Sequence, residues 1–261
     1  MNSIVLSTII FIILYLFIKM NINKYYFKQG RCRMNDIKNY KSTKFKIANK
    51  DNHYALTKIN KNKTNNVMIV AHGNAGSFLD REYLFDNLEN YDGDIYVIEY
   101  PGFSGIDGKT CIKNCISEIF YWIKTLSNQY HKIDLYGESI GGGLIIETFV
   151  YYKLNNFTKN GIININNIYL QSTFTSMSDV LYSLDYKLYL LYKFLLIDDL
   201  NTLKNIKNIY ECNKIFIIHS KEDQLINFNH AMINYKEFKK YNKNVKFIYA
   251  TGDHQHTKFN L

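Results

Sequence analysis

Between residues 67 and 249 of this 261-residue chain, short apolar runs alternate with longer segments of helical pattern. A short continuous apolar run is typical of a strand that is buried on both faces. The predicted strands are Val67–Ala71, Ile95–Ile98, Ile133–Tyr136, Ile168–Leu170, Ile215–Ile218 and Val245–Tyr249. The predicted helices are Phe78–Leu88, Ile112–Leu126, Ile140–Tyr152 and Phe228–Tyr241. This alternation predicts an α/β fold with a mostly parallel central sheet and helices on both faces.

Two extended stretches, Lys44–Ile47 and Tyr54–Ile59, precede the alternation and flank a polar turn at residues 49–52. They predict an antiparallel hairpin at the start of a single folded domain, which we place at residues 43–261. In a parallel sheet, ligands bind beyond the carboxyl ends of the strands. Functional residues are therefore expected directly after the predicted strands.

The sequence GESIG (residues 137–141) lies between a predicted strand and a predicted helix. This is the G-x-S-x-G pattern in the context in which the serine is a nucleophile. The serine must adopt a strained backbone that leaves no room for a Cβ two residues to either side, and Gly137 and Gly141 meet that demand. Ser139 is the predicted nucleophile; an idle serine in a glycine-rich helix start is the alternative.

Backbone N–H groups are the expected stabilisers of the negative charge that develops on an attacked carbonyl. The N–H of Ile140, at the start of the helix behind Ser139, is the first predicted donor. The second is expected after an earlier strand, in HGNAG (residues 72–76), where we assign the N–H of Asn74 with Ala75 as the alternative. His72 precedes the nucleophile in the chain, and we interpret it as structural.

A carboxylate is expected in the turn HSKEDQ (residues 219–224), which follows a predicted strand. Such a group holds an imidazole in one tautomer and stabilises its protonated form. We choose Asp223 as this acid, with Glu222 as the alternative.

The base is expected in TGDHQH (residues 251–256), after the last predicted strand. We choose His254 over His256, because Gly252 favours a tight turn just before it. Nucleophile, acid and base then follow one another along the chain in the order that this arrangement requires.

Taken in chain order, these segments resemble membrane-anchored α/β-hydrolases related to a yeast bud-emergence protein, as well as lysophospholipid lipases and acyl-protein depalmitoylases. The matching segments are HGNAG (72–76), EYPGFSG (99–105), GESIGGG (137–143), STFTSM (172–177), DDLNTLKNIKNI (198–209), HSKEDQLI (219–226) and GDHQHT (252–257). The resemblance covers nearly the whole chain after its first residues. It implies the α/β-hydrolase fold, hydrolysis of esters or thioesters, no metal or organic cofactor, and the roles given above to Ser139, Asp223 and His254.

The sequence departs from this family in two places. Leu225 and Ile226 stand where the family often carries a proline after the acid. Relatives also continue beyond the position of Leu261 into a packing helix, so the chain is trimmed or truncated there. We therefore expect the loop that carries His254 to be less rigid than catalysis needs.

The N-terminal segment predicts a membrane anchor, because residues 1–18 carry no charged side chain and Ile4–Ile18 is almost wholly apolar. About 20 such residues span a bilayer, so we predict one transmembrane helix at residues 1–20. A cleaved signal peptide is disfavoured, since no positive region precedes the run and no small-residue cleavage site follows it.

Residues 21–42 are the predicted basic juxtamembrane linker. The positive charges that follow the apolar run are Lys19, Lys24, Lys28, Arg31 and Arg33. The positive-inside rule then places the catalytic domain on the cytoplasmic side, where these charges can touch anionic lipid. Glycosylation sequons at Asn62 and Asn156 would matter only in a lumenal protein, and we attribute them to chance in an asparagine-rich chain.

The overall composition argues against two other classes of function. The net charge is +9, but the lysines are scattered and no nucleic-acid-binding motif accompanies them, so we expect no nucleic-acid partner. The cysteines lack C-x-x-C spacing, and we interpret them as core thiols rather than as metal ligands or a disulfide framework. They are Cys32, Cys111, Cys115 and Cys212.

The sequence therefore predicts a serine hydrolase that cleaves carboxylic ester or thioester bonds through an acyl-enzyme. A membrane anchor favours a lipid or a lipidated protein as the substrate. A serine peptidase or amidase on the same fold and a non-catalytic scaffold are the alternatives. The apolar segment Leu188–Ile197 would line an acyl channel or touch the bilayer in the lipid case, but we favour an ordinary core helix.

Overall fold

The central sheet confirms the predicted α/β architecture. The computed structural model describes residues 13, 27, 30, 32–62, 64–194, 200–209 and 211–261. Within these residues the sheet has eight strands, and each predicted strand is present. They are β1 (Lys46–Lys50), β2 (His53–Lys58), β3 (Asn66–Ala71), β4 (Asp94–Ile98), β5 (Lys132–Glu138), β6 (Ile165–Gln171), β7 (Lys214–Ser220) and β8 (Val245–Ala250).

The strands lie in the order β1-β2-β4-β3-β5-β6-β7-β8. The predicted hairpin forms β1 and β2, which pair antiparallel, and β2 also runs antiparallel to β4. All other neighbours, from β4 to β8, are parallel. The carboxyl ends of β3, β5, β7 and β8 therefore open on the same edge of the sheet.

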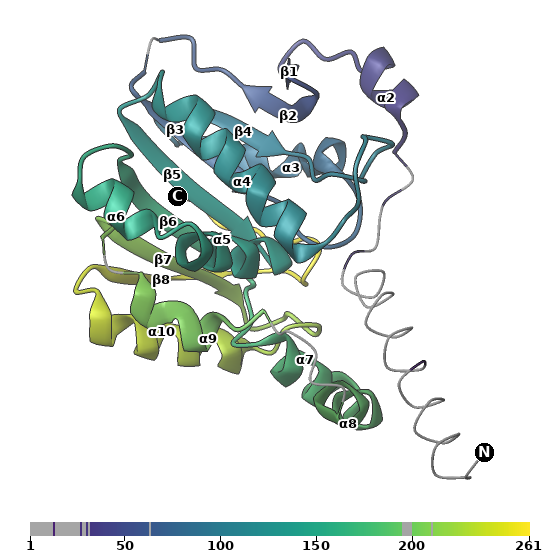
Figure 1. The fold of residues 1–261 in the computed structure, drawn as a ribbon, viewed down its shortest axis with the longest axis vertical. Helices are drawn as coiled ribbons and strands as arrows, with labels where there is room; N and C mark the ends of the chain where they lie inside the picture. The colour runs from purple at the N-terminus through teal and green to yellow at the C-terminus, as the bar shows by residue number, and fades with distance from the viewer. Residues whose placement is uncertain are drawn as a thin grey trace.

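Helices cover both faces of the sheet (Figure 1). The described helices are α2 (Met34–Asn39), η1 (Phe78–Arg81), α3 (Tyr83–Asn87), α4 (Ile112–Ser127), α5 (Ile140–Tyr151), α6 (Leu154–Lys159), α7 (Met177–Leu184), α8 (Tyr186–Phe194), α9 (Thr202–Asn205), η2 (Ile206–Asn208) and α10 (Phe228–Tyr241). The side chains of α4, α5 and α10 share one core with one face of the strands. Those of η1, α3 and α2 share a second core with the other face.

Alternate residues of a strand supply the two cores, as the pleat requires. Val67 and Ile69 of β3 belong to the core under α4 and α5, whereas Met68 and Val70 belong to the core under α3. Because both faces of β3 are buried, its sequence is a continuous apolar run rather than an alternating one.

Two predicted segments differ from the structure. The predicted helix Phe78–Leu88 is a 3-10 turn, η1, followed by a short α-helix, α3, with Glu82 between them. The predicted linker at residues 21–42 is in part packed on the domain, since Phe27 is buried in the core and α2 lies inside the predicted linker.

The predicted anchor at residues 1–20 lies, except for residue 13, outside the described residues. Over the part of the chain that the structure describes, we find no helix with both the length and the apolar character needed to cross a membrane.

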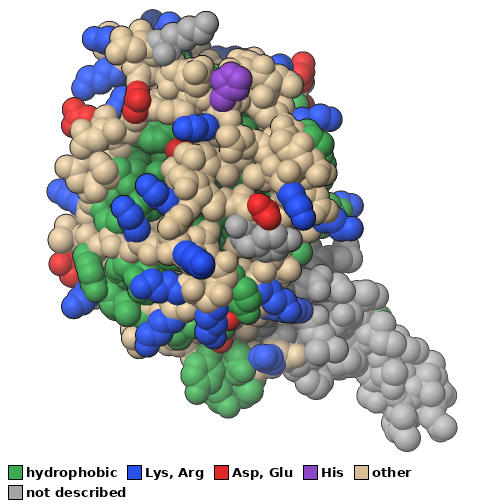
Figure 2. Space-filling view, turned by 90° about the vertical axis from the view of Figure 1, so that its left-hand side faces the viewer, with side chains coloured by type: hydrophobic (Ala, Val, Ile, Leu, Met, Phe, Trp, Pro, Cys, Tyr) green, Lys and Arg blue, Asp and Glu red, His purple; other side chains and the backbone are tan. Residues whose placement is uncertain are grey.

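Helices α7 and α8 project from one end of the domain (Figure 1). Exposed apolar side chains gather on this projection, as the space-filling view also shows (Figure 2). They are Tyr182, Leu184, Tyr186 and Leu190. The interpretation of Leu188–Ile197 as a core helix is therefore wrong for its described part, because Leu190 is 48% exposed. The apolar run reflects a surface helix, which an apolar pattern alone does not distinguish from a buried one.

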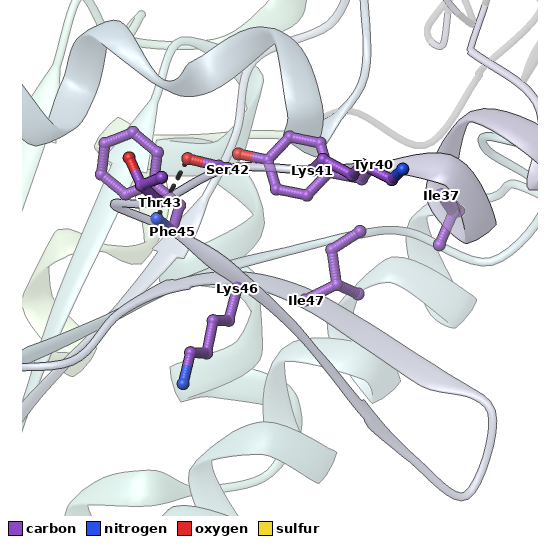
Figure 3. A pocket seen from close by; sticks show the side chains of 8 residues that line it. All are labelled: Ile37, Tyr40, Lys41, Ser42, Thr43, Phe45, Lys46 and Ile47. Carbon is purple, nitrogen blue, oxygen red and sulfur yellow. Dashed lines mark hydrogen bonds between the residues drawn. The ribbon is translucent and has the colours of Figure 1, made fainter.

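A hollow of about 660 Å³ lies between α2 and β1 (Figure 3). It is lined by Ile37 and by residues 40–43 and 45–47. The hydroxyl of Ser42 there accepts hydrogen bonds from the N–H groups of Lys44 and Phe45. None of the residues predicted to be catalytic lines it.

Candidate active site

Three side chains that follow three different strands meet at the carboxyl edge of the sheet. His254 Nε2 lies 3.0 Å from Ser139 Oγ, and His254 Nδ1 lies 2.7 Å from Asp223 Oδ2. A carboxylate only accepts, so Nδ1 carries the ring proton and Nε2 can accept the proton of the serine hydroxyl. The structure thus brings the predicted nucleophile, acid and base into one hydrogen-bonded chain.

Ser139 occupies the sharp turn between β5 and α5. Its backbone has φ 54° and ψ −116°, a strained conformation for a residue with a Cβ. The turn is crowded: a Cβ on Gly137 would lie 2.3 Å from the Cα of Gly142, and one on Gly141 would lie 2.0 Å from the carbonyl oxygen of Ala71. The need for glycine at residues 137 and 141 is thereby confirmed.

Asp223 is held by two backbone N–H groups as well as by His254. Its Oδ1 accepts from Leu225 N at 3.0 Å and from Ile226 N at 2.8 Å. Burial alone would raise the pKa of this carboxyl, but the hydrogen bond and charge of His254 and the N–H of Ile226 hold the pKa below its usual range. Asp223 is therefore a carboxylate at neutral pH.

The loop that carries His254 is fastened at its base. Thr251 and Lys258 exchange two backbone hydrogen bonds of 3.0 and 2.8 Å. Gly252 has φ +86°, and a Cβ there would lie 2.3 Å from the carbonyl oxygen of His256. These contacts close the turn around His254 at its base. How rigid the loop is in solution stays a prediction.

The two alternative residues lie elsewhere. His256 is exposed and its Nδ1 lies 2.9 Å from Asp253 Oδ1. Glu222 accepts a hydrogen bond of 3.0 Å from the N–H of Gly252, so it contacts the backbone of the base loop. The geometry of the site favours Asp223 and His254 over both.

His219 lies behind the acid and was not singled out by the sequence. Its Nε2 donates to the carbonyl of Ile226 at 2.8 Å and lies 3.6 Å from Asp223 Oδ2. Burial lowers the pKa of His219, outweighing the nearby carboxylate. A neutral His219 thus braces the turn that presents Asp223.

One predicted oxyanion donor is next to the nucleophile in the chain, and the other follows the strand beside β5. Ile140 is the first residue of α5, where backbone N–H groups have no partner inside the helix. Asn74 lies in the loop after β3, and β3 is the neighbour of β5 in the sheet. Their part in an oxyanion hole stays a prediction.

No group of His, Cys, Asp and Glu side chains within the described residues is arranged to hold a metal ion. The four cysteines are free thiols, and only Cys115 among them is fully buried. The interpretation as core thiols is therefore right for Cys115. Cys32 and Cys212 are partly buried and pack against the two cores, whereas the partly buried Cys111 belongs to neither.

Sequence comparison does not assign this chain to a protein family. No protein-family model matches the chain. An uncharacterized protein of Acanthamoeba polyphaga mimivirus is 29% identical over 202 residues, which are 73% of this chain and 67% of that protein.

Solved structures resemble this chain over most of its length. An esterase of Pyrococcus furiosus has a TM-score of 0.59 at 17% identity, over 87% of this chain and 89% of its own. An alpha-beta hydrolase of Vibrio vulnificus has a TM-score of 0.66 at 12% identity, over 89% of this chain and 83% of its own. This chain has the α/β-hydrolase fold. A carboxyl esterase of Tuber melanosporum is also similar, with a TM-score of 0.56 at 12% identity, over 80% of this chain and 79% of its own.

Proposed function

We propose that this protein is a serine hydrolase that cleaves carboxylic ester or thioester bonds. The observation that carries the proposal is the position of the His254 ring, with Nε2 3.0 Å from Ser139 Oγ and Nδ1 2.7 Å from Asp223 Oδ2. The similarity of this chain to solved esterases supports ester hydrolysis. Because a fold alone does not determine function, the proposal rests on the site geometry.

The reaction follows from this geometry. His254 Nε2 takes the proton of Ser139 as Oγ attacks the substrate carbonyl, and Asp223 stabilises the imidazolium that forms. The N–H groups of Ile140 and Asn74 stabilise the oxyanion. The tetrahedral intermediate collapses as His254 gives its proton to the leaving alcohol or thiol. Water, deprotonated by His254, then cleaves the acyl-enzyme and restores Ser139.

Covalent labelling of the full chain in detergent with a fluorophosphonate tests the proposal. The wild type should be labelled, and Ser139→Ala and His254→Ala should not. His256→Ala is the matched control, because it removes an exposed imidazole two residues from the base and should label like the wild type. Persistent labelling of Ser139→Ala would reject the nucleophile, and a folded wild type without label would favour a non-catalytic scaffold.

The substrate is proposed to be a lipid or a lipidated protein, presented at a membrane by the N-terminal segment, with the catalytic domain in the cytoplasm. The exposed apolar side chains of α7 and α8 support a lipid-facing surface, since large apolar patches mark interaction sites. Lys187 and Lys193 on α8 would suit an anionic lipid surface.

Turnover of acyl esters, acyl thioesters and aminoacyl naphthylamides separates the remaining possibilities. Faster turnover of the esters or thioesters is expected, with long acyl chains preferred. Preference for the naphthylamides would instead favour a peptidase or amidase. Alkaline extraction tests the anchor, because an anchored chain should stay in the membrane pellet. Protease added to the cytoplasmic side tests the orientation, because it should digest the catalytic domain.

A further inference from the structure

The backbone of Gly73, Asn74 and Ala75, which we call the oxyanion loop, is bonded to buried side chains along its length. The carbonyl of Gly73 accepts from His72 Nδ1 at 2.8 Å. The N–H of Gly73 donates to Glu138 Oε2 at 2.9 Å, and the carbonyl of Ala75 accepts from Arg81 Nη2 at 2.7 Å.

The bond from His72 determines which way the next N–H points. The carbonyl of Gly73 and the N–H of Asn74 belong to one peptide unit, which is planar and trans, so they point in opposite directions. Because His72 Nδ1 holds the carbonyl, rotation of this unit would break the bond. His72 thus fixes the direction of the Asn74 N–H.

A buried carboxylate fixes the His72 ring. Glu99 Oε1 lies 2.8 Å from His72 Nε2, and both side chains are fully buried. Glu99 is itself held by the hydroxyl of Ser104 at 2.6 Å and the N–H of Tyr100 at 3.0 Å. The carbonyl oxygen of Gly73 and Oε1 of Glu99 only accept, so a ring that bonds both of them carries a proton on each nitrogen. It therefore cannot turn without breaking a bond at each nitrogen.

A second buried carboxylate ties the loop to the nucleophile turn. Glu138 directly precedes Ser139, and its Oε2 accepts from Arg81 Nε at 2.7 Å. Burial would raise the pKa of Glu138, but the charge of Arg81 and hydrogen bonds from Tyr83 and Gly73 hold it below its usual range. The Arg81 guanidinium, through two of its nitrogens, thus links Ala75 to the residue beside the nucleophile.

We propose that His72 and Arg81, each anchored by a buried carboxylate, are positioning residues that aim the Asn74 N–H at the oxyanion formed on attack by Ser139. Neither touches the substrate; each acts through the backbone of the oxyanion loop. The inference rests on the proposed function and adds two residues to its machinery.

Four single substitutions in the full chain test this role. His72→Asn keeps a donor near the place of Nδ1, whereas His72→Gln carries its donor near Nε2 and loses the bond to Gly73. Arg81→Lys keeps the charge but not the fork that reaches both Glu138 and Ala75. Asp134→Asn is the control, since Asp134 is a buried carboxylate on the same strand as Glu138 that bonds Asn166 and Asn167 instead of the loop.

Kinetics with a p-nitrophenyl ester are the first readout. His72→Gln and Arg81→Lys should lower kcat by about 10- to 100-fold, less than the loss of a whole oxyanion donor, with KM nearly unchanged. A trifluoromethyl ketone, which forms an oxyanion on Ser139, should bind weaker by the same factor. Asp134→Asn should keep kcat within about threefold of the wild type, and His72→Asn should retain more of the wild-type kcat than His72→Gln does. Equal kcat in His72→Asn and His72→Gln would overturn the proposal.

Amide hydrogen exchange of residues 73–76 is a readout that does not need turnover. It should be faster in His72→Gln and Arg81→Lys than in the wild type, and unchanged in Asp134→Asn. If the wild type neither turns over the ester nor takes the fluorophosphonate, the proposed function fails, and exchange still decides whether these residues hold the loop. Unchanged exchange in both variants would overturn the inference.

Discussion

The backbone N–H of Gly30 donates to the carbonyl of Gly76 at 3.1 Å, which joins the segment before the domain to the end of the HGNAG loop. A Cβ on Gly30 would lie 2.7 Å from the Cα of Gly76, so the two backbones touch. Nearby, Phe27 packs edge-on against Phe103 with ring centroids 6.4 Å apart. This segment is therefore part of the fold next to the proposed site.

Removal of this packing should cost stability. Phe27→Ala is expected to lower the free energy of unfolding by about 3 kcal/mol, as for other buried aromatic side chains. A chain that begins at residue 22 should melt like the full chain, whereas one that begins at residue 35 should melt lower and hydrolyse esters more slowly. Thermal melting followed by circular dichroism measures this, and equal melting temperatures for both truncated chains would contradict it.

The nucleophile turn should not tolerate a methyl group at Gly141. Gly141→Ala would place a Cβ 2.0 Å from the backbone oxygen of Ala71, which cannot move aside as a side chain can. The expected loss is more than about 3 kcal/mol, the upper end of ordinary overpacking. Gly143→Ala on the same helix is the control, because its Cβ would meet the ring of Phe174 at 3.2 Å and needs only a small shift. Urea unfolding that shows equal losses would contradict the crowding argument.

Loss of the acid should strongly reduce kcat without unfolding the chain. Asp223→Asn is expected to reduce kcat by about 10³- to 10⁴-fold, because the base loses the partner that fixes its tautomer. Glu222→Gln should reduce it only slightly, since Glu222 contacts the N–H of Gly252. Ester hydrolysis by the two variants checks this, and a larger effect at residue 222 would reverse the assignment of the acid.

Stability should fall in two steps as the pH drops. Burial in the folded state lowers the pKa of His219 and His230. As the pH drops, these two residues therefore bind protons in the unfolded state before they do so in the folded state. The free energy of unfolding then declines below about pH 6.5. A second decline should begin below about pH 4, because the pKa values of Asp223 and Glu138 are also lowered on folding, despite burial, by their partners.

His219→Gln isolates the upper step, because glutamine keeps a donor for the carbonyl of Ile226 but does not titrate. Urea midpoints measured across the acid range should decline less in this variant than in the wild type between about pH 6.5 and 5. The same decline in both proteins would assign the upper step to other groups.

The sequence predicted those features whose structure is determined within one short segment of the chain. Ser139, Asp223 and His254 each lie in the turn that follows an apolar run, so their common edge could be predicted from the parallel arrangement of the strands. The hairpin turn was readable for the same reason: Asp51 and Asn52 have φ of 52° and 64°, which these residue types tolerate.

Contacts between distant segments could not be predicted in this way. Nothing beside Gly30 in the sequence indicates that it meets Gly76, and nothing beside Arg81 indicates a partner at residue 138. The exposure of Leu190 was missed because the apolar run has the same pattern in a surface helix and in a buried one.

Ser139 and His254 are 115 residues apart in the chain. The histidine follows β8, which among the described strands lies at the edge of the sheet and pairs only with β7. A molecule in which β8 has not yet docked would possess the serine but lack its base. Covalent labelling of Ser139 would therefore detect fully folded molecules and not those that lack a docked β8. Under the proposed chemistry, the fraction of molecules that take the label equals the fraction in which the sheet is assembled as far as β8.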